Sequence, residues 1–263
     1  MNFRKSRLIL KGKIKDFYYS LVLKNKIKKY FKEIKKTKPR KVIYTCFTGV
    51  DYDSINVNEY LDSNYEYICF TDNEKQIKRG TVGPWQVRPL VFAKLDNQKN
   101  NRYHKFFPNE LFPEFDESIY VDTNVVVKTS KLFDAAAKIS KTMAFMAIPP
   151  HRRTKCIYDE LEKCLKVGKD KKETLDKHRA FLEAEGFPKN LGLTENNVIY
   201  RKHNDPECIK IMQQWWNMIE NYSKRDQLSL FYVLWKNEME MTYLLDKAIK
   251  DDKKNFQINH HNV

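Results

Sequence analysis

The polar residue that stands out in this sequence is Asp122, because it begins the polar group Asp122-Thr123-Asn124 that interrupts an apolar run from Ser118 to Val127. A carboxylate within such a run is costly to bury unless a partner, a metal or a ligand compensates its charge. Two interpretations follow. Either the strand ends at Asp122-Thr123-Asn124 and the carboxylate belongs to a site, or Asp122 is a turn, cap or internally paired residue.

Polar residues also follow the first two predicted strands, which end at Thr48-Gly49 and Thr71-Asp72. In open α/β sheets, ligands gather at the carboxyl ends of the strands, where loops converge. A glycine at position 49 would let the backbone approach a bound nucleotide closely, although a lone glycine after a strand is more often a turn. Thr48, Gly49 and Asp72 are therefore candidate nucleotide-binding residues.

Basic residues suited to anionic ligands occur in two further places. Arg102 and Lys105 are three positions apart on a predicted helix, so they share one face and could meet a diphosphate. The alternative for this pair is a solvated helix face. His151 and Arg153 follow Pro149-Pro150 at the end of a predicted strand, where they could bind an anionic donor or acceptor.

The elements that must position these residues begin at Lys41. From there, apolar runs of strand length alternate with turn signals and helical stretches, which predicts an α/β domain with helices on the faces of a sheet. The predicted strands span residues 42–47, 65–70, 85–90, 118–127, 142–148, 197–200 and 256–259. The predicted helices span residues 101–111, 209–219 and 227–235, with two more between 153 and 185 that break near Gly168.

The first 40 residues differ from the rest in charge. They contain 15 Lys and Arg against two acids, or +13 of the net charge of +15, which leaves only +2 for the other 223 residues. Between residues 8 and 34, apolar positions recur every three or four residues with lysines between them, which predicts one basic amphipathic helix or two short ones. We therefore divide the chain into a basic helical arm with its linker, residues 1–40, and a single domain, residues 41–263.

The basic arm allows three interpretations. Its apolar face could insert into the headgroup region of an anionic membrane, with the lysines on phosphates. It could equally pack on the domain and leave its lysine face in water. Nucleic-acid binding ranks third, because no recognition module accompanies the arm and the domain is nearly neutral. We therefore expect an anionic membrane surface as the partner of residues 1–38, and no nucleic acid.

The cysteines and apolar runs indicate a cellular compartment. Five cysteines at wide spacings, without a C-x-x-C pair, are typical of reduced thiols in a cytosolic protein. The sequence has no run of 18 apolar residues, the length that could span a bilayer. The N-terminus also lacks an apolar stretch of signal-peptide length, which argues against secretion. We expect a cytoplasmic protein, peripheral at the inner face of the cell membrane.

A set of short segments between residues 41 and about 236 carries a resemblance to known enzymes. They are Phe70-Thr71-Asp72-Asn73, Trp85 to Leu90, Asn101-Arg102 with Lys105, Tyr120 to Asn124, the group His151, Arg153, Cys156, Tyr158 and Glu160, then Gly186-Phe187-Pro188, Gly192-Leu193, Arg201 with His203-Asn204, Trp215-Trp216 and Ser223 to Ser229. In this order they resemble the GT-A glycosyltransferases. They are most similar to a glycosyltransferase-like family of plants and bacteria, long described as a domain of unknown function, whose plant members are linked to cell-wall polysaccharide.

The resemblance implies a GT-A-like (Rossmann-like) α/β fold, a central mixed sheet flanked by helices, that binds a nucleotide-sugar donor. In such enzymes a divalent cation, Mn²⁺ or Mg²⁺, neutralises the diphosphate leaving group. Asp122 would be a metal ligand, and Asn124 takes the place of the second acid of the D-x-D motif, with Thr123 between them. Asn124 departs from the family pattern, since an amide is a weaker ligand. His260 or His261 would complete the metal shell, although a polar tail would explain them equally well.

The resemblance also assigns roles to two later segments. Glu195 and Asn196 fall in the stretch that contacts the donor sugar, although a helix or strand cap would explain the same residues. Asp226 falls in the acceptor-side motif, where an acid faces the reacting carbon as a general base or stabilises developing positive charge. Capping by Ser223 is the alternative for this segment. The predicted donor-binding residues are thus Thr48, Gly49, Asp72, Arg102, Lys105, Asp122, Thr123, Asn124, Glu195 and Asn196.

Together these features predict a glycosyltransferase. It would move a sugar from a nucleotide-sugar to a surface-glycan or lipid-linked acceptor, as in the assembly of polysaccharide, lipopolysaccharide or capsule. Three alternatives stay open: a partner protein that keeps the fold without turnover, a nucleic-acid-binding protein that uses the lysine-rich arm, and a hydrolase on the same scaffold.

Overall fold

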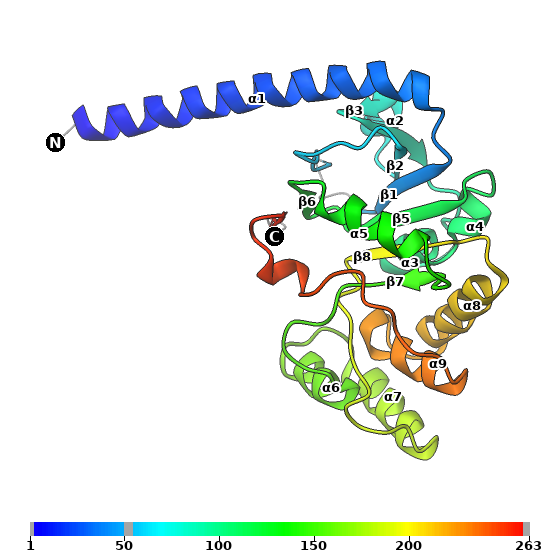
Figure 1. Cartoon of the computed structure of the whole chain (residues 1–263). Helices are drawn as coiled ribbons and strands as arrows, with labels where there is room; N and C mark the ends of the chain where they lie inside the picture. Colours follow the sequence, from blue (N-terminus) through cyan, green and yellow to red (C-terminus); the bar gives the residue numbers. More distant parts are fainter. Residues whose placement is uncertain (1–2, 50–54, 260–263) are drawn as a thin grey trace.

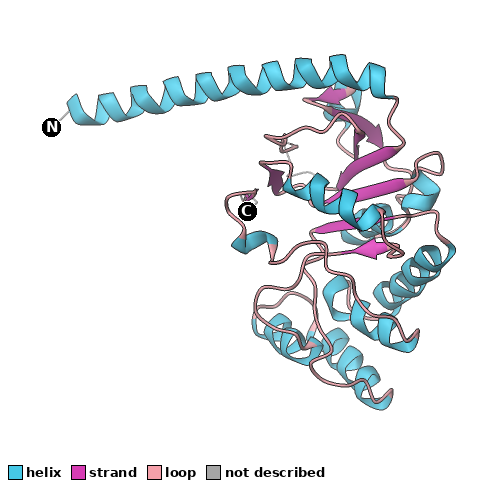
Figure 2. Cartoon of the chain, viewed as in Figure 1, coloured by secondary structure: helices cyan, strands magenta, loops and turns pink. Residues whose placement is uncertain are grey.

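The computed structural model describes residues 3–49 and 55–259, with side chains from residue 20 onward. Within these ranges the chain forms a sheet covered by helices, and a long N-terminal helix projects from it (Figures 1 and 2). The helices are α1 (Phe3–Thr37), α2 (Glu74–Arg79), α3 (Asn97–Phe106), α4 (Pro108–Leu111), α5 (Lys131–Ser140), α6 (Ile157–Lys166), α7 (Lys172–Ala184), α8 (Pro206–Asn221) and α9 (Leu230–Lys236), with 3₁₀ turns η1 (Asp226–Leu228) and η2 (Ile249–Asp251). The strands are β1 (Lys41–Phe47), β2 (Tyr65–Thr71), β3 (Thr81–Val82), β4 (Trp85–Pro89), β5 (Glu117–Val121), β6 (Val125–Val127), β7 (Met146–Ala147), β8 (Val198–Arg201) and β9 (Phe256–Ile258).

Seven of these strands form one mixed sheet in the order β3-β4-β2-β1-β5-β8-β7. Strands β4, β2, β1 and β5 are parallel, so their carboxyl ends share one edge. Strand β8 is antiparallel to β5, so its amino end lies at that same edge, and β7 is antiparallel to β8. Strands β6 and β9 form a separate antiparallel pair. The predicted α/β class with a mixed central sheet is therefore confirmed.

The strands send alternate side chains into two apolar cores on opposite faces of the sheet. On β1, Tyr44 enters the core that α3 and α6 to α9 cover. Its neighbour Ile43 enters the core formed with α5, Tyr30 of α1 and residues 244–256. All five cysteines are free and buried, as expected for thiols that act as small core side chains.

The predicted strand 118–127 is wrong in extent. The chain turns after β5, where the Val125 N–H donates to the Asp122 carbonyl at 2.9 Å, and the three valines that follow join a different sheet as β6. Asp122, Thr123 and Asn124 therefore lie in a loop at the carboxyl edge of the main sheet. Asp122 thus follows the end of the strand, as the first interpretation requires, and also begins a turn, as the second allows.

Other differences are smaller. The predicted helix 101–111 begins at Asn97 and ends before Pro108, which starts a separate short helix, since proline cannot donate the hydrogen bond that would continue α3. The predicted strand 142–148 is reduced to the two residues of β7. Helices α2 and α5 and strand β3 were not predicted.

The basic arm is one continuous helix of 35 residues. Its last turns pack on the domain: Tyr30 is buried, its hydroxyl donates to the Tyr65 carbonyl at 3.0 Å, and its ring meets the edge of Tyr67. Lys26 Nζ also donates to the Glu59 carbonyl at 2.7 Å. The amino-terminal half of α1 extends away from the domain (Figure 1). Among the described helices, none is both long enough and apolar enough to cross a membrane.

Candidate functional site

The carboxyl ends of β1 and β5 and the amino end of β8 bring distant loops together at one edge of the sheet. Asp122 follows β5 directly, and its N–H donates to the Asn197 carbonyl at 2.8 Å. Since Asn197 precedes β8, this bond places Glu195 and Asn196 beside the Asp122 loop. The antiparallel pairing of β5 with β8 is thus what unites two predicted donor-binding segments that lie about 70 residues apart in the sequence.

Helix α3 supplies two cations to the same place. Lys105 is 1% exposed, and its Nζ lies 2.5 Å from Asp226 Oδ2. Arg102 Nε lies 3.8 Å from the same oxygen. Asp226, the first residue of η1, is itself only 3% exposed. A buried ion pair contributes little to stability after its desolvation cost, so this cluster is better explained by a function at the site.

The two cations also change the acidity of Asp226. Burial alone would raise the pKa of its carboxyl, but Lys105 and Arg102 outweigh burial and hold that pKa well below its usual range. Such a carboxylate is a weak base, and its Oδ2 is already bonded to Lys105. Of the two roles predicted for Asp226, stabilisation of developing positive charge fits this environment better than general base catalysis.

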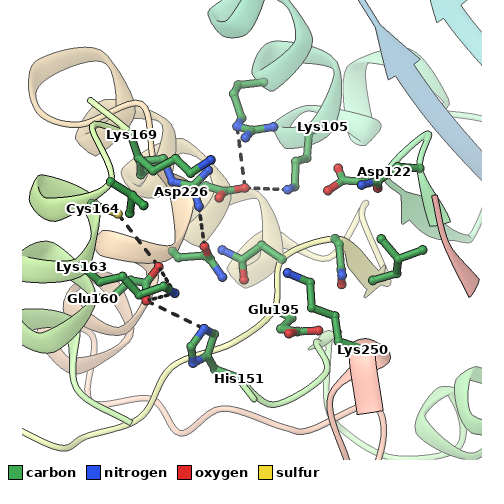
Figure 3. A pocket seen from close by; sticks show the side chains of 18 of the residues that line it. Lys105, Asp122, His151, Glu160, Lys163, Cys164, Lys169, Glu195, Asp226 and Lys250 are labelled. Carbon is green, nitrogen blue, oxygen red and sulfur yellow. Dashed lines mark hydrogen bonds and ion pairs between the residues drawn. The ribbon is translucent and has the colours of Figure 1, made fainter. Parts of the chain in front are cut away.

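A cavity of about 490 Å³ opens beside this cluster. In Figure 3 it extends from Asp122, after β5, to Glu160 on α6, with Asp226 between them. Six cationic and four acidic side chains line it, and this surplus of positive charge suits a diphosphate. Its lining residues are Arg102, Lys105, Asp122, Asn124, His151, Glu160, Lys163, Cys164, Val167, Lys169, Glu195, Asn196, Asn197, Arg225, Asp226, Gln227, Lys250, Ile258 and Asn259.

A second cavity, of about 310 Å³, adjoins the first over the carboxyl end of β1 and the amino end of α3. The two cavities share Arg102, Asp122, Asn124 and Arg225. Thr48 lines the smaller one. A ligand made of two bulky parts joined by an anionic group could therefore fill both cavities and place that group beside Arg102 and Asp122.

Several buried polar atoms on the wall of the larger cavity have no hydrogen-bond partner among the described residues. They are Arg102 Nε, Glu195 Oε2, Asn196 Nδ2, Asn197 Oδ1 and Arg225 Nε. Buried polar groups are nearly always hydrogen-bonded, so these atoms are available to a ligand. Burial also raises the pKa of Glu195. Both donors and acceptors occur in the set, as the recognition of sugar hydroxyls requires.

Of the predicted site residues that the structure describes, three line neither cavity. The Gly49 N–H donates to both oxygens of Asp72, at 3.1 and 3.0 Å, and Gly49 has a φ of 105°, which favours glycine. Asp72 thus binds the backbone of Gly49, at the end of β1. Arg153 is exposed, whereas His151, two residues earlier, lines the larger cavity. The other predicted donor-binding residues, and Asp226, lie together in the walls of the two cavities.

The larger cavity also contains residues that the sequence did not single out as site residues. Lysines such as Lys169 and Lys250 carry no sequence signal, because an exposed lysine usually belongs to a solvated surface. Glu160 did carry a signal beyond its place in the resemblance. It is an acid on the apolar stripe of α6, between Ile157 and Leu161, which are both buried.

The described residues supply few ligands for a metal ion. Within residues 3–49 and 55–259 there is no group of three His, Cys, Asp or Glu side chains that could hold one. Asp122 and Asn124 line the larger cavity, as does Asn259, whose N–H donates to the Asn124 carbonyl at 2.8 Å. The predicted ligands His260 and His261 lie outside the described residues. One carboxylate with amide oxygens suits Mg²⁺ or Mn²⁺ only when phosphate oxygens of a ligand complete the shell.

Comparison with known proteins identifies relatives of this chain. The family described as TOD1/MUCI70, glycosyltransferase-like domain, matches residues 31–261. Among curated proteins, the chain is 22% identical over 223 residues to the probable hexosyltransferase MUCI70 of Arabidopsis thaliana, which covers 77% of this chain and 38% of that protein. The chain thus spans well under half the length of this relative.

Two solved structures are also similar. Mouse xyloside xylosyltransferase 1, in its apo form, is 11% identical, with a TM-score of 0.46 over 78% of this chain and 85% of that chain. The glycosyltransferase GlyE of Streptococcus pneumoniae is 12% identical, with a TM-score of 0.38 over 77% of this chain and 45% of that chain.

Proposed function

Because this chain belongs to the TOD1/MUCI70 glycosyltransferase-like domain family, we propose that it is a hexosyltransferase, which moves a hexose from a nucleotide-sugar to a hydroxyl group of an acceptor. The observation that carries the proposal is the pair of adjoining cavities that meet at Arg102 and Asp122. A nucleotide-sugar has the matching layout, since its nucleoside and its sugar are joined through a diphosphate.

In this arrangement the nucleoside occupies the smaller cavity and the sugar occupies the larger one. The diphosphate lies between them, beside Arg102, Lys105 and Arg225. As the bond between the sugar and the diphosphate breaks, negative charge grows on the leaving group. Fixed cations in a largely buried site stabilise that charge without having to reorganise, which is where an enzyme gains most of its rate.

The sugar carries positive charge in the same step. Asp226 is a fixed carboxylate in the wall of the larger cavity, and its ion pair with Lys105 keeps it ionised and in place. It is suited to stabilise an electron-poor anomeric carbon. The unpartnered polar atoms of Glu195 and Asn196 would bind the sugar hydroxyls and fix its orientation.

A divalent cation, Mn²⁺ or Mg²⁺, belongs to this proposal as a companion of the nucleotide. Asp122 and Asn124 would be its ligands from the described chain, which fits the preference of these ions for one or two carboxylates together with substrate phosphates. Such an ion would neutralise charge on the diphosphate as a Lewis acid. Arg102 and Lys105 provide fixed positive charge at the same place.

For the acceptor we propose a surface glycan or a lipid-linked glycan, presented at the cytoplasmic face of the membrane. The support for this location is the arm. Residues 3–19 contain six Lys and Arg and one acid, and they form the half of α1 that extends from the domain (Figure 1). A helix of this composition is attracted to anionic lipids.

The proposal is tested by nucleotide release from a panel of nucleotide-hexoses, with and without Mn²⁺. The wild type should turn over at least one donor, and Asp122→Ala should lose about 100-fold or more in rate, as enzymes do when one charge-stabilising group is removed. The matched control is Asp116→Ala. Asp116 precedes β5 at the opposite edge of the sheet, where it forms an exposed ion pair with Arg40.

One observation favours a second candidate, a partner protein that binds nucleotide-sugars without turnover. Asn124 stands where a second acid would strengthen metal binding. Thermal shift separates the candidates, because a ligand that binds the folded state stabilises it by mass action. Stabilisation by a nucleotide-sugar without any release of nucleotide would favour the non-catalytic partner and contradict the enzyme.

A further inference from the structure

The end of the larger cavity opposite Asp122 is not used by the chemistry described so far. Glu160, His151 and Lys163 line it, and Figure 3 shows their side chains gathered together on the far side of Asp226. Glu160 lies in the first turn of α6 and is 3% exposed. A carboxylate so deeply buried beside an open cavity needs an explanation.

The position of Glu160 on its helix shows that packing does not explain it. Ile157, Leu161 and Cys164 are buried, and they flank Glu160 on the face of α6 that contacts the core. An apolar residue at position 160 would continue this stripe. Burial removes the water around the carboxylate, and its ion pair with the half-exposed Lys163 offsets little of that cost, so a ligand explains the carboxylate better than the fold does.

Three neighbours contact the carboxylate. Lys163 Nζ lies 2.8 Å from Oε2 and 3.1 Å from Oε1, His151 Nε2 lies 3.9 Å from Oε2, and the Cys164 thiol donates to Oε1 at 3.9 Å. Burial lowers the pKa of His151, so its ring is neutral at pH 7. Nδ1 lies 3.1 Å from the Thr154 carbonyl oxygen and 3.4 and 3.2 Å from the N–H groups of Arg153 and Thr154, so this loop fixes the ring with Nε2 towards Glu160.

We propose that Glu160 binds the acceptor: its carboxylate accepts hydrogen bonds from hydroxyl groups of the acceptor glycan, while His151 and Lys163 are positioning residues. The inference rests on the proposed function, because it places the donor at the Asp122 end of the cavity. A carboxylate offers about four lone-pair positions. Lys163 is the described donor that bonds it most closely, and 52% of the Lys163 side chain is exposed, so hydroxyl groups can reach the remaining positions.

The experiment compares two acceptors for the same donor. Water is the first, measured as nucleotide release without added sugar, and a panel of methyl α- and β-hexosides is the second. The wild type should transfer to at least one glycoside. Glu160→Gln should lower kcat/KM for that glycoside about tenfold or more, as expected when a charged hydrogen-bond acceptor is lost. The KM for the donor and the rate with water should change less than about twofold.

Two further variants separate binding from folding. Glu162→Gln is the matched control, because Glu162 is on the same helix, pairs with Arg179 at 3.4 Å and lies outside the cavity lining; it should behave as the wild type. Glu160→Leu should have a Tm at or above that of the wild type and should still lose transfer to the glycoside. If Glu160→Leu loses transfer only because it unfolds, its Tm will lie below that of the wild type.

Unchanged transfer in Glu160→Gln would overturn this inference. So would an equal loss with water and with the glycoside, or a raised KM for the donor, because either result would assign Glu160 to the donor end. In all these cases the wild type still releases nucleotide, and the proposed function stands. A wild type that releases no nucleotide from any donor would overturn the proposed function, and this inference with it.

Discussion

Lys105 and Asp226 depend on each other, because neither charge has enough water around it to compensate for the loss of the other. Replacing Asp226 by Asn would leave Lys105 buried beside Arg102 without its hydrogen-bonded anion, with only the more distant charge of Asp122 to compensate it. We expect this variant to lose about 3–5 kcal/mol of unfolding free energy, the usual cost of removing one partner from a buried ion pair. Urea unfolding of wild type and variant measures the difference.

The double variant Lys105→Met, Asp226→Leu is the control for this prediction. It removes both charges and keeps side chains of similar volume, so it should recover most of the lost stability. Donor turnover should stay lost in both variants. If Asp226→Asn loses less than about 1 kcal/mol of unfolding free energy, Lys105 is uncharged or reaches water. That result would contradict a buried ion pair between Lys105 and Asp226.

The ligand set around Asp122 predicts how a metal ion binds. One carboxylate with amides is too weak a site alone, so Mn²⁺ without nucleotide should shift the Tm very little. With the nucleoside diphosphate of the preferred donor, Mn²⁺ should add stability, by about 2.7 kcal/mol at 100 times its Kd. Asp122→Asn should abolish the increment from Mn²⁺ but keep metal-free binding of the nucleotide, whereas Asp116→Asn should keep both. A Tm shift from Mn²⁺ without nucleotide would contradict this weak ligand set.

At the scale of elements, the sequence predicts a strand around Asp122 but not that this strand ends at Val121. Three valines follow Asn124, and their β propensity favours continuation, so local pattern alone predicts one long strand. What ends β5 is the pairing of each half with a partner far away in the sequence, β8 on one side and β9 on the other. Strand pairing over such distances is set by the tertiary fold and carries no local signal.

Helix α5 was missed for a different reason. Leu132, Phe133 and Ala136 are buried on one face of it, but the stretch has only ten residues, and a short apolar run does not by itself distinguish a helix from a strand. By contrast, α8 was predicted well because its apolar residues repeat at helical spacing along 16 residues. The resemblance to a glycosyltransferase-like family is confirmed by the family match, which begins within α1 at residue 31.

Helix α7 contains a buried histidine that predicts a pH dependence of stability. His178 is 0% exposed, neither ring nitrogen has a hydrogen-bond partner among the described residues, and burial lowers its pKa to about 4. Asp170 opposes this shift weakly, and the ring of Tyr222 lies 5.2 Å away. Between the folded pKa and the unfolded value of about 6.5, the unfolded state binds more protons. Stability should therefore fall as the pH drops from about 6.5 towards 4, by up to about 3 kcal/mol.

The measurement is urea unfolding at a series of pH values for the wild type and His178→Leu. Other buried histidines, such as His104 and His203, also have lowered pKa values because of burial, so the wild-type curve alone does not isolate His178. The difference between the two curves does. The variant should lose less stability between pH 6.5 and 4. Parallel curves would show that His178 is not the titrating group.

For the whole molecule, the arm and the domain differ strongly in net charge, but the structure does not separate them fully. The composition of residues 1–40 left membrane binding and packing on the domain equally open. The structure shows packing for the last turns of α1, through Ile34 and Tyr30. The larger cavity could not be assembled from the sequence alone, because its cations come from α3, α6, the α6–α7 loop, the α8–η1 loop and η2, and only the fold brings them together.

We expect the basic amino-terminal half of α1 and its packed last turns to have separate effects. Deletion of residues 1–19 removes six Lys and Arg and one acid but leaves Tyr30 in place. Stability of the domain should not change. Binding to phosphatidylserine vesicles at low salt should fall by at least about a hundredfold, since each basic residue near an anionic surface contributes roughly 1 kcal/mol. Co-sedimentation with the vesicles measures this.

Tyr30→Ala in the full-length chain should do the opposite. It empties a buried site between α1 and β2, at a cost of about 3 kcal/mol in unfolding free energy, and it leaves the basic half of the helix intact. Vesicle binding should persist at temperatures where this variant is folded. Because the attraction is electrostatic, binding by the wild type should weaken as salt is raised and should be absent with neutral phosphatidylcholine. A truncated chain that binds anionic vesicles as tightly as the full chain would show that the membrane surface is not the partner of the arm.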